Sequence, residues 1–164
     1  MIEICPSDTD SALMLLRTRQ TFAASREEVF AFFADAANLQ SITPPWLRFR
    51  ILTPLPIDMK KGTLIDYRLR LHGFPIRWRT EICEWEPPFR FADRQLRGPY
   101  RLWHHTHTFE EVSDGTLMTD EVEYAVPGGR LVNRWFVEGD LRRIFTYRTE
   151  QLAQRYAVGE SVNS

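Results

Sequence analysis

Three of the four histidines of this chain lie within four positions, in the segment LWHHTHTF that spans residues 102–109. If that segment is a β-strand, its side chains alternate between two faces. His105 and His107 then share one face, and His104 points the other way. Two neighbouring imidazoles can bind a metal ion, exchange protons with a substrate, or line a polar pocket.

These chemistries place different demands on the rest of the chain. A metal ion shared by the imidazoles could take oxygen from Asp93 or Asp120, but a third histidine is missing because His72 falls in a turn. We therefore expect no metal and no cofactor.

Acid/base catalysis needs a carboxylate beside an imidazole, which fixes the tautomer and raises the histidine pKa. The candidate proton-transfer residues are His105, His107, Asp93 and Asp120. No nucleophile motif accompanies them.

The composition of the 164 residues is that of an ordinary globular domain, with 43% hydrophobic and 13% aromatic residues. This length can bury a substantial core, so we expect a single ligand-binding domain over 12–157. An N-terminal segment, 1–11, precedes it, and a C-terminal tail, 158–164, follows it. The formal net charge of -1 provides no basic field, which argues against a nucleic-acid partner.

The two cysteines, Cys5 and Cys83, are far apart and form no CxxC motif. This usage fits reduced thiols better than a disulfide framework. The first residues, MIEICPSDTD, have neither the charged start nor the apolar run of a signal peptide. No apolar run approaches the ~18 residues of a membrane-spanning helix. We therefore expect a cytoplasmic protein without stable membrane association.

The elements that must position these residues follow from local patterns. Residues 12–22 alternate and predict a first strand. Ser25, with Glu28 three residues on, predicts the start of a short helix, because the hydroxyl can cap the first turn. A second brief helix is expected over 39–42, ended by the prolines at 44–45.

From residue 47 to residue 126 the hydrophobic period is two. Over 65–71, for example, Ile, Tyr, Leu and Leu alternate with Asp, Arg and Arg. Each strand therefore has one covered face and one solvated face. Short loops such as SDGT favour antiparallel connections, and we expect six consecutive strands.

From Arg130 to Tyr156, apolar residues recur at the spacing of one face of a long helix, which also carries Glu138 and Arg142 as an i,i+4 pair. From this helix, the core is expected to include Trp135, Phe136 and Phe145. An antiparallel sheet with one apolar face needs a covering layer. The terminal helix is the only element long enough to supply it.

Five stretches carry a resemblance to a known family: ITPPWLRFRI, GTLIDYRLRLHG, RWRTEICEWEPP, GPYRLWHHTHTF and GTLMTDEVEYAVPGG. Over about residues 13–156 the chain resembles the START-like, helix-grip (SRPBCC) superfamily. It is most similar to a bacterial ligand-binding branch related to polyketide cyclases/dehydrases and coenzyme Q-binding START proteins. The resemblance implies an α+β fold in which a curved seven-stranded antiparallel sheet wraps around a long C-terminal helix and a cavity, with two short helices after strand 1. It does not specify the chemistry, since the superfamily includes transporters, sensors, hydrolases and cyclases.

Turn sequences set the strand register independently of the resemblance. Asp114-Gly115 is a strong two-residue hairpin signal. It predicts the pairs Phe109 with Asp120, His107 with Val122, and His105 with Tyr124. A turn at 98–100 predicts Gln95 with Trp103, Asp93 with His105, and Phe91 with His107. The turn at 72–73 predicts Tyr67 with Trp78 and Ile65 with Thr80. A slip by one residue would move a whole strand's side chains to the other face.

Together these registers predict a row of mostly polar residues across the covered face: Thr80, Asp93, His105 and Tyr124. Buried polar groups need partners, so they should bond to one another, to water or to a ligand. An aromatic surface with a few convergent polar groups is the usual form of a small-molecule site. The expected ligand-binding residues are Tyr67, Trp78, Thr80, Asp93, Gln95, Trp103, His105, His107, Asp120 and Tyr124.

The leading functional hypothesis is a carrier or sensor for a hydrophobic or amphipathic small molecule, acting as a monomer or homodimer. An alternative is a cyclase or dehydratase that acts on a polyketide-like or other carbonyl substrate. In that case the histidines and aspartates of the covered face would transfer protons. A third hypothesis is an interaction module attached to a partner enzyme.

Overall fold

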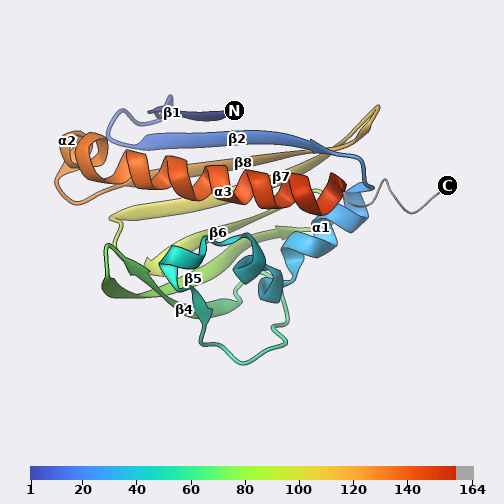
Figure 1. Ribbon diagram of the computed structural model, residues 1–164, viewed down its shortest axis with the longest axis horizontal. Coiled ribbons are helices and arrows are strands. Elements are labelled where there is room, and N and C mark those ends of the chain that lie inside the picture. The colour runs from blue at the N-terminus through green and yellow to red at the C-terminus, as the bar shows by residue number, and fades with distance from the viewer. Residues whose placement is uncertain (158–164) are drawn as a thin grey trace.

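The computed structural model describes residues 1–157. Its eight strands form one antiparallel sheet, and the long C-terminal helix lies across one face of it (Figure 1). Three short helical segments follow the second strand. The first, over 26–34, lies near the C-terminal end of the long helix, and the second, over 36–42, contacts that helix (Figure 1). This is the predicted α+β helix-grip arrangement, and the expected tail, 158–164, lies outside the described residues.

The strands are β1 (Ile2–Pro6), β2 (Met14–Phe22), β3 (Arg50–Ile51), β4 (Leu64–Leu71), β5 (Phe74–Glu86), β6 (Arg90–Arg97), β7 (Leu102–Val112) and β8 (Gly115–Ala125). The helices are α1 (Arg26–Ala34), the 3-10 helices η1 (Ala36–Ile42) and η2 (Pro45–Leu47), α2 (Gly129–Val132), the π-helical turn η3 (Asn133–Val137) and α3 (Glu138–Ala157). The strand order is β1-β2-β8-β7-β6-β5-β4-β3.

The predicted count of seven strands was one too low. The additional strand is β1, which pairs with β2 at the edge of the sheet. It is five residues long and ends in Pro6, and Ile2 and Ile4 are its half-buried residues. So short an alternation is a weak signal, since proline tends to mark edge strands or the ends of strands.

The predicted helix start at Ser25 is confirmed, because the Ser25 hydroxyl accepts a hydrogen bond from the Glu28 backbone N–H at 3.2 Å. The second short helix begins at Ala36, three residues before the predicted start at Leu39. Its cap is Asp35, whose carboxylate accepts the Ala37 N–H at 2.9 Å. An Asp cap satisfies a free N–H of the first turn and so moves the start of the helix upstream.

The terminal helix runs without a break from α2 through η3 into α3. The predicted Glu138–Arg142 ion pair is present at 2.9 Å. The expectation that Trp135 and Phe136 are core residues is wrong, since these residues are 71% and 72% exposed. Both lie in η3, whose wider π turn rotates the helix face that precedes α3 and breaks the predicted apolar stripe.

Two of the three predicted strand registers are confirmed. Asp93 pairs with His105 and Phe91 with His107 across β6 and β7, although this ladder ends at Arg94 and does not include the predicted Gln95–Trp103 pair. Tyr67 pairs with Trp78 across β4 and β5. The third is wrong by two residues: His107 pairs with Asp120.

The turn itself explains that error. The two turn residues are Ser113 and Asp114, and Gly115 already belongs to β8. A shift by two residues keeps every side chain on its predicted face but changes its partner.

Gly115 is a position that only glycine suits. Its φ is 131°, and a Cβ atom there would lie 2.0 Å from the backbone oxygen of Phe22. Gly73, in the β4–β5 turn, also has a positive φ of 82°, but a Cβ atom there would meet nothing within 4 Å. Alanine substitutions at these two glycines therefore separate two costs: backbone strain, which both positions share, and steric overlap, which only Gly115 has.

We predict that Gly115→Ala lowers the free energy of unfolding by more than about 2 kcal/mol, because strain and overlap add. Gly73→Ala should cost about 1 kcal/mol from strain alone. Urea unfolding followed by circular dichroism measures both. Equal losses in the two variants would contradict the close approach of β8 to the end of β2.

Candidate functional site

A cavity of about 210 Å³ lies between the sheet and the terminal helix. Most of its wall is apolar and aromatic, with Phe49, Tyr67, Trp78 and Trp103 among the lining residues. The polar and charged side chains in its lining include Thr80, Asp93, His105, His107 and Arg148. The cavity therefore has a mostly apolar wall with one group of charged side chains in it.

Seven of the ten expected ligand-binding residues line this cavity: Tyr67, Trp78, Thr80, Asp93, Trp103, His105 and His107. They come from β4 to β7, which present alternate residues to the covered face. The other three, Gln95, Asp120 and Tyr124, do not line it.

Each of these three residues has a different position. The Gln95 amide bonds to the backbone of Tyr100, with Nε2 donating to the carbonyl at 2.8 Å. Tyr124 is fully buried and packs in the cluster of Leu16 and Phe145. Asp120 lies behind the imidazoles, with 3% of its surface exposed.

The predicted polar row is only partly correct. Asp93 and His105 are opposite each other, but their outer neighbours across the sheet are Ile82 and Val122 instead of Thr80 and Tyr124. Irregularities in the β5–β6 pairing and the two-residue shift of β8 account for this. Thr80 still reaches Asp93 diagonally, with its hydroxyl 3.0 Å from Asp93 Oδ1.

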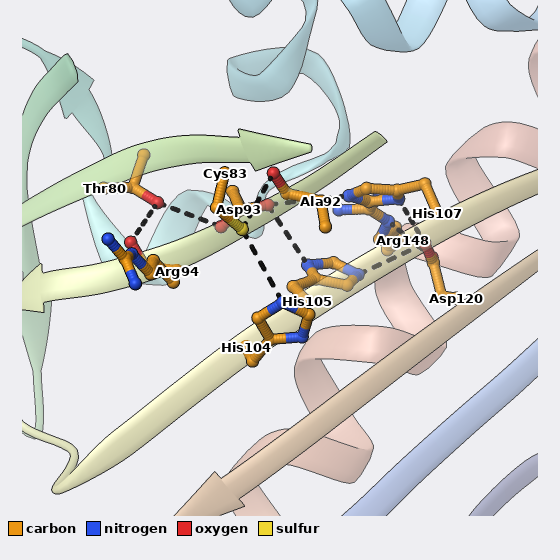
Figure 2. A network of polar contacts seen from close by, with 10 residues as sticks. All are labelled: Thr80, Cys83, Ala92, Asp93, Arg94, His104, His105, His107, Asp120 and Arg148. Carbon is orange, nitrogen blue, oxygen red and sulfur yellow. Dashed lines mark hydrogen bonds and ion pairs between the residues drawn. The ribbon is translucent and has the colours of Figure 1, made fainter. Parts of the chain in front are cut away.

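Asp120 brings the charged groups together (Figure 2). Its Oδ1 atom lies 2.5 Å from His107 Nδ1 and 3.2 Å from His105 Nε2. Its Oδ2 atom lies 3.3 Å from Nε of Arg148, which reaches in from α3. One buried carboxylate thus contacts two imidazoles and a guanidinium.

Asp93 faces the same imidazoles from the other side. Its Oδ2 atom lies 3.9 Å from His105 Nδ1 and 3.7 Å from His107 Nε2. Both imidazole rings therefore lie between two carboxylates, with one nitrogen toward each (Figure 2).

Arg148 was not among the site residues predicted from the sequence. The buried residues of α3 are Leu141, Phe145, Arg148 and Leu152, at the spacing of one helix face. A charged residue in the middle of an apolar stripe is a readable signal, because such a charge must find a buried partner. The sequence alone does not say which carboxylate that partner is.

The pKa values of these groups diverge. Burial opposes ionisation of Asp120, but Arg148 and His107 hold the pKa of this carboxyl well below its usual value. Burial likewise disfavours charge on His107, yet Asp120 and Asp93 raise the pKa of its imidazole. Burial and the neighbouring His107 lower the pKa of His105. Despite its burial, His107 and His105 also lower the pKa of Asp93.

These directions favour a proton on His107 over one on His105. With His107 protonated and His105 neutral, the two carboxylates balance one imidazolium and one guanidinium. Such a neutral cluster is the form in which a protein interior tolerates several ionised groups. Chemically, it offers a charged donor and a neutral imidazole at the wall of an apolar cavity.

Comparison with known proteins identifies a family and a set of solved structures that this chain resembles. Residues 22–152 match the family model described as polyketide cyclase / dehydrase and lipid transport. No curated protein matches the chain. Among the residues that the structure describes, no helix has both the length and the apolar character to cross a membrane.

Solved structures share the fold. A protein from Rhodobacter sphaeroides is 22% identical, with 96% of this chain and 99% of that chain covered and a TM-score of 0.66. A protein from Arthrobacter aurescens is 16% identical, with 94% and 91% covered and a TM-score of 0.69. Ginseng major latex-like protein 151 from Panax ginseng is 10% identical, with 88% and 98% covered and a TM-score of 0.65.

We predict that Arg148→Met costs about 3 kcal/mol of folding free energy, because it leaves Asp120 buried without its guanidinium partner. The matched control is Arg17→Met. It removes the ion pair between Arg17 on β2 and Glu121, the residue that follows Asp120 on β8. That pair is 2.6 Å long, but its side chains are 33% and 39% exposed. The control should cost about 1 kcal/mol or less. Urea unfolding of both variants checks this, and similar losses would argue against a buried charge cluster.

Proposed function

The chain belongs to the polyketide cyclase/dehydrase and lipid transport family, and from that premise we propose that it carries or senses one hydrophobic or amphipathic small molecule. Its fold is the START-like helix-grip fold, and hydrophobic ligand binding is a property of the family. The proposal for this chain concerns the cavity between the sheet and α3.

The observation that carries the proposal is the asymmetry of the cavity lining. Aromatic side chains such as Tyr67 and Trp103 form much of the wall, while the ionised cluster around His107 lies on one side. A ligand with an apolar body and a polar head would satisfy both surfaces. The apolar part gains the free energy of leaving water, and the polar head meets fixed donors and acceptors.

Trp78 adds a second polar contact for such a ligand. It lines the cavity, and its indole Nε1 is buried without a hydrogen-bond partner within residues 1–157. A buried donor that lacks a partner costs free energy, which an acceptor atom on a bound molecule would recover. This supports a ligand with more than one oxygen or nitrogen atom.

An enzyme of the cyclase or dehydratase type is the second candidate. The observation that favours it is the pair of cavity-lining imidazoles with opposite pKa shifts, raised for His107 and lowered for His105. Adjacent acid and base groups of this kind can move a proton at a carbonyl compound.

We predict that Leu69→Trp lowers the affinity for 8-anilinonaphthalene-1-sulfonate, an aromatic probe with one anionic head group, by about tenfold or more. Leu69 lines the cavity, so the larger indole would fill part of it. Leu64→Trp is the matched control, since Leu64 belongs to the same strand but lies on its other face and is 45% exposed. Fluorescence titration measures both affinities.

Equal affinity of these two variants would place the probe outside the cavity and contradict the proposed site. Mass spectrometry of organic extracts from freshly purified protein then identifies the natural ligand. A fatty or aromatic molecule with a polar head is the expected passenger.

A further pair of substitutions separates carriage from catalysis. For a carrier, we predict that His105→Gln and His107→Gln change the affinity for the extracted ligand only modestly and that no product appears. For an enzyme, conversion of that ligand should fall by about 10²- to 10⁴-fold in both variants. His104→Gln, on the outer face of the same strand, should leave conversion unchanged. Chromatography of ligand incubated with each protein decides between the two.

A further inference from the structure

We propose that Asp93, His105 and His107 form a binding site for a divalent first-row transition-metal ion at the cavity wall, with Asp120 as the residue that orients both imidazoles. This goes beyond the proposed function, because the ion would bind whether or not an organic molecule fills the cavity.

The positions of the potential ligand atoms are the first argument. One ligand atom from each of the three residues lies within 4.8 Å of the other two. Asp93 Oδ2 is 3.9 Å from His105 Nδ1 and 3.7 Å from His107 Nε2. Ligands of a tetrahedral zinc ion, at 2.0–2.2 Å from the metal, are separated by about 3.3 Å. Small side-chain movements would therefore close the site around an ion.

The second argument is the position of Asp120. It contacts His107 Nδ1 and His105 Nε2, which are the nitrogens opposite those that face Asp93 (Figure 2). A histidine that ligates a metal commonly donates its other ring N–H to a carboxylate, which fixes the tautomer and the ring orientation. Asp120 is hydrogen-bonded to His105 Nε2 in this way and lies 2.5 Å from His107 Nδ1, so a rotation of the His107 ring would let one carboxylate orient both rings.

The tautomers then leave three electron-pair donors facing one another. If each ring donates its N–H to Asp120, the opposite nitrogens carry lone pairs directed toward the Asp93 carboxylate. The Thr80 hydroxyl lies 3.0 Å from Asp93 Oδ1, which leaves Oδ2 for the site. A cation placed between donors that converge in this way would contact all three of them at once.

No metal was expected from the sequence, because a third histidine is missing even though Asp93 or Asp120 could supply oxygen. The structure brings Asp93 to both imidazoles, and two histidines with one carboxylate form a common set for iron and zinc. Asp93, His105 and His107 all line the cavity, whereas Asp120 lies behind it. The remaining coordination positions of the ion would therefore face the cavity.

Charge also indicates what would fill those positions. With both imidazoles neutral, Asp93 and Asp120 contribute -2, Arg148 contributes +1 and the ion +2, which leaves +1. A buried site with that excess favours an anionic ligand. We therefore expect hydroxide or the carboxylate, enolate or phenolate oxygen of a small molecule to coordinate the ion.

The test uses the untagged, chelator-treated protein, titrated with Co²⁺ by visible absorption and with Zn²⁺ by calorimetry. We expect one equivalent of either ion to bind and to raise the midpoint of thermal unfolding. His105→Gln, His107→Gln and Asp93→Asn should each weaken binding by about 100-fold or more. Asp120→Asn should weaken it by about 10- to 100-fold, because it acts through the ligands.

Two matched controls are available in the remaining histidines. His104 is on the outer face of β7, and His72 is exposed in the β4–β5 turn. His104→Gln and His72→Gln should bind Co²⁺ as the unchanged protein does. X-ray absorption of the Zn²⁺-loaded, unsubstituted protein provides a readout that no misfolded variant can affect. It should show two imidazole ligands.

The proposal is overturned if the unsubstituted protein binds no stoichiometric Co²⁺ or Zn²⁺, or if the absorption spectrum lacks imidazole. It is also overturned if loss of His104 or His72 weakens binding as much as loss of His107. Binding of the anilinonaphthalene probe is measured on the same metal-free samples. Probe binding without metal binding would overturn the metal site and leave the proposed carrier function standing.

Discussion

The buried Asp120 carboxylate is the interaction on which the rest of the site depends. It contacts His105, His107 and Arg148 in a region where each is almost fully removed from water. Charges in such an environment are tolerated only when they are balanced, since the cost of desolvation exceeds what a single contact returns. The cluster meets this condition as a set, and the loss of a charged member such as Arg148 leaves an uncompensated charge.

The same cluster joins the two layers of the fold. The sheet provides both carboxylates and both imidazoles, while the guanidinium comes from α3 (Figure 2). Apolar contacts of Leu141 and Phe145 hold the helix against the sheet, and Arg148 adds a directional contact between them. A helix held in this way forms one side of the cavity, so the position of the helix and the chemistry of the cavity wall are coupled.

Local signals in the sequence predicted much of this fold. The Ser25 cap, the alternating strands and the Glu138–Arg142 pair all depend on residues close in sequence, and all three are present. The exposed aromatics of η3 were predicted wrongly, because one π turn alters the helix face in a way that apolar spacing does not show. The register of β8 failed for a related reason: Asp114-Gly115 left open which residues make the turn, and a choice between neighbours shifts every partner by two.

The sequence by itself determined that His105 and His107 share one covered face, because the side-chain period of a strand is two whatever its partner. It also placed Asp93 opposite His105 through the length of a single turn. Only the tertiary structure decided that His107 meets Asp120, and that Arg148 completes the cluster. The physical reason is distance along the chain. The first contact depends on a turn with two permitted registers, and the second on how a helix packs across a sheet, which no local pattern specifies.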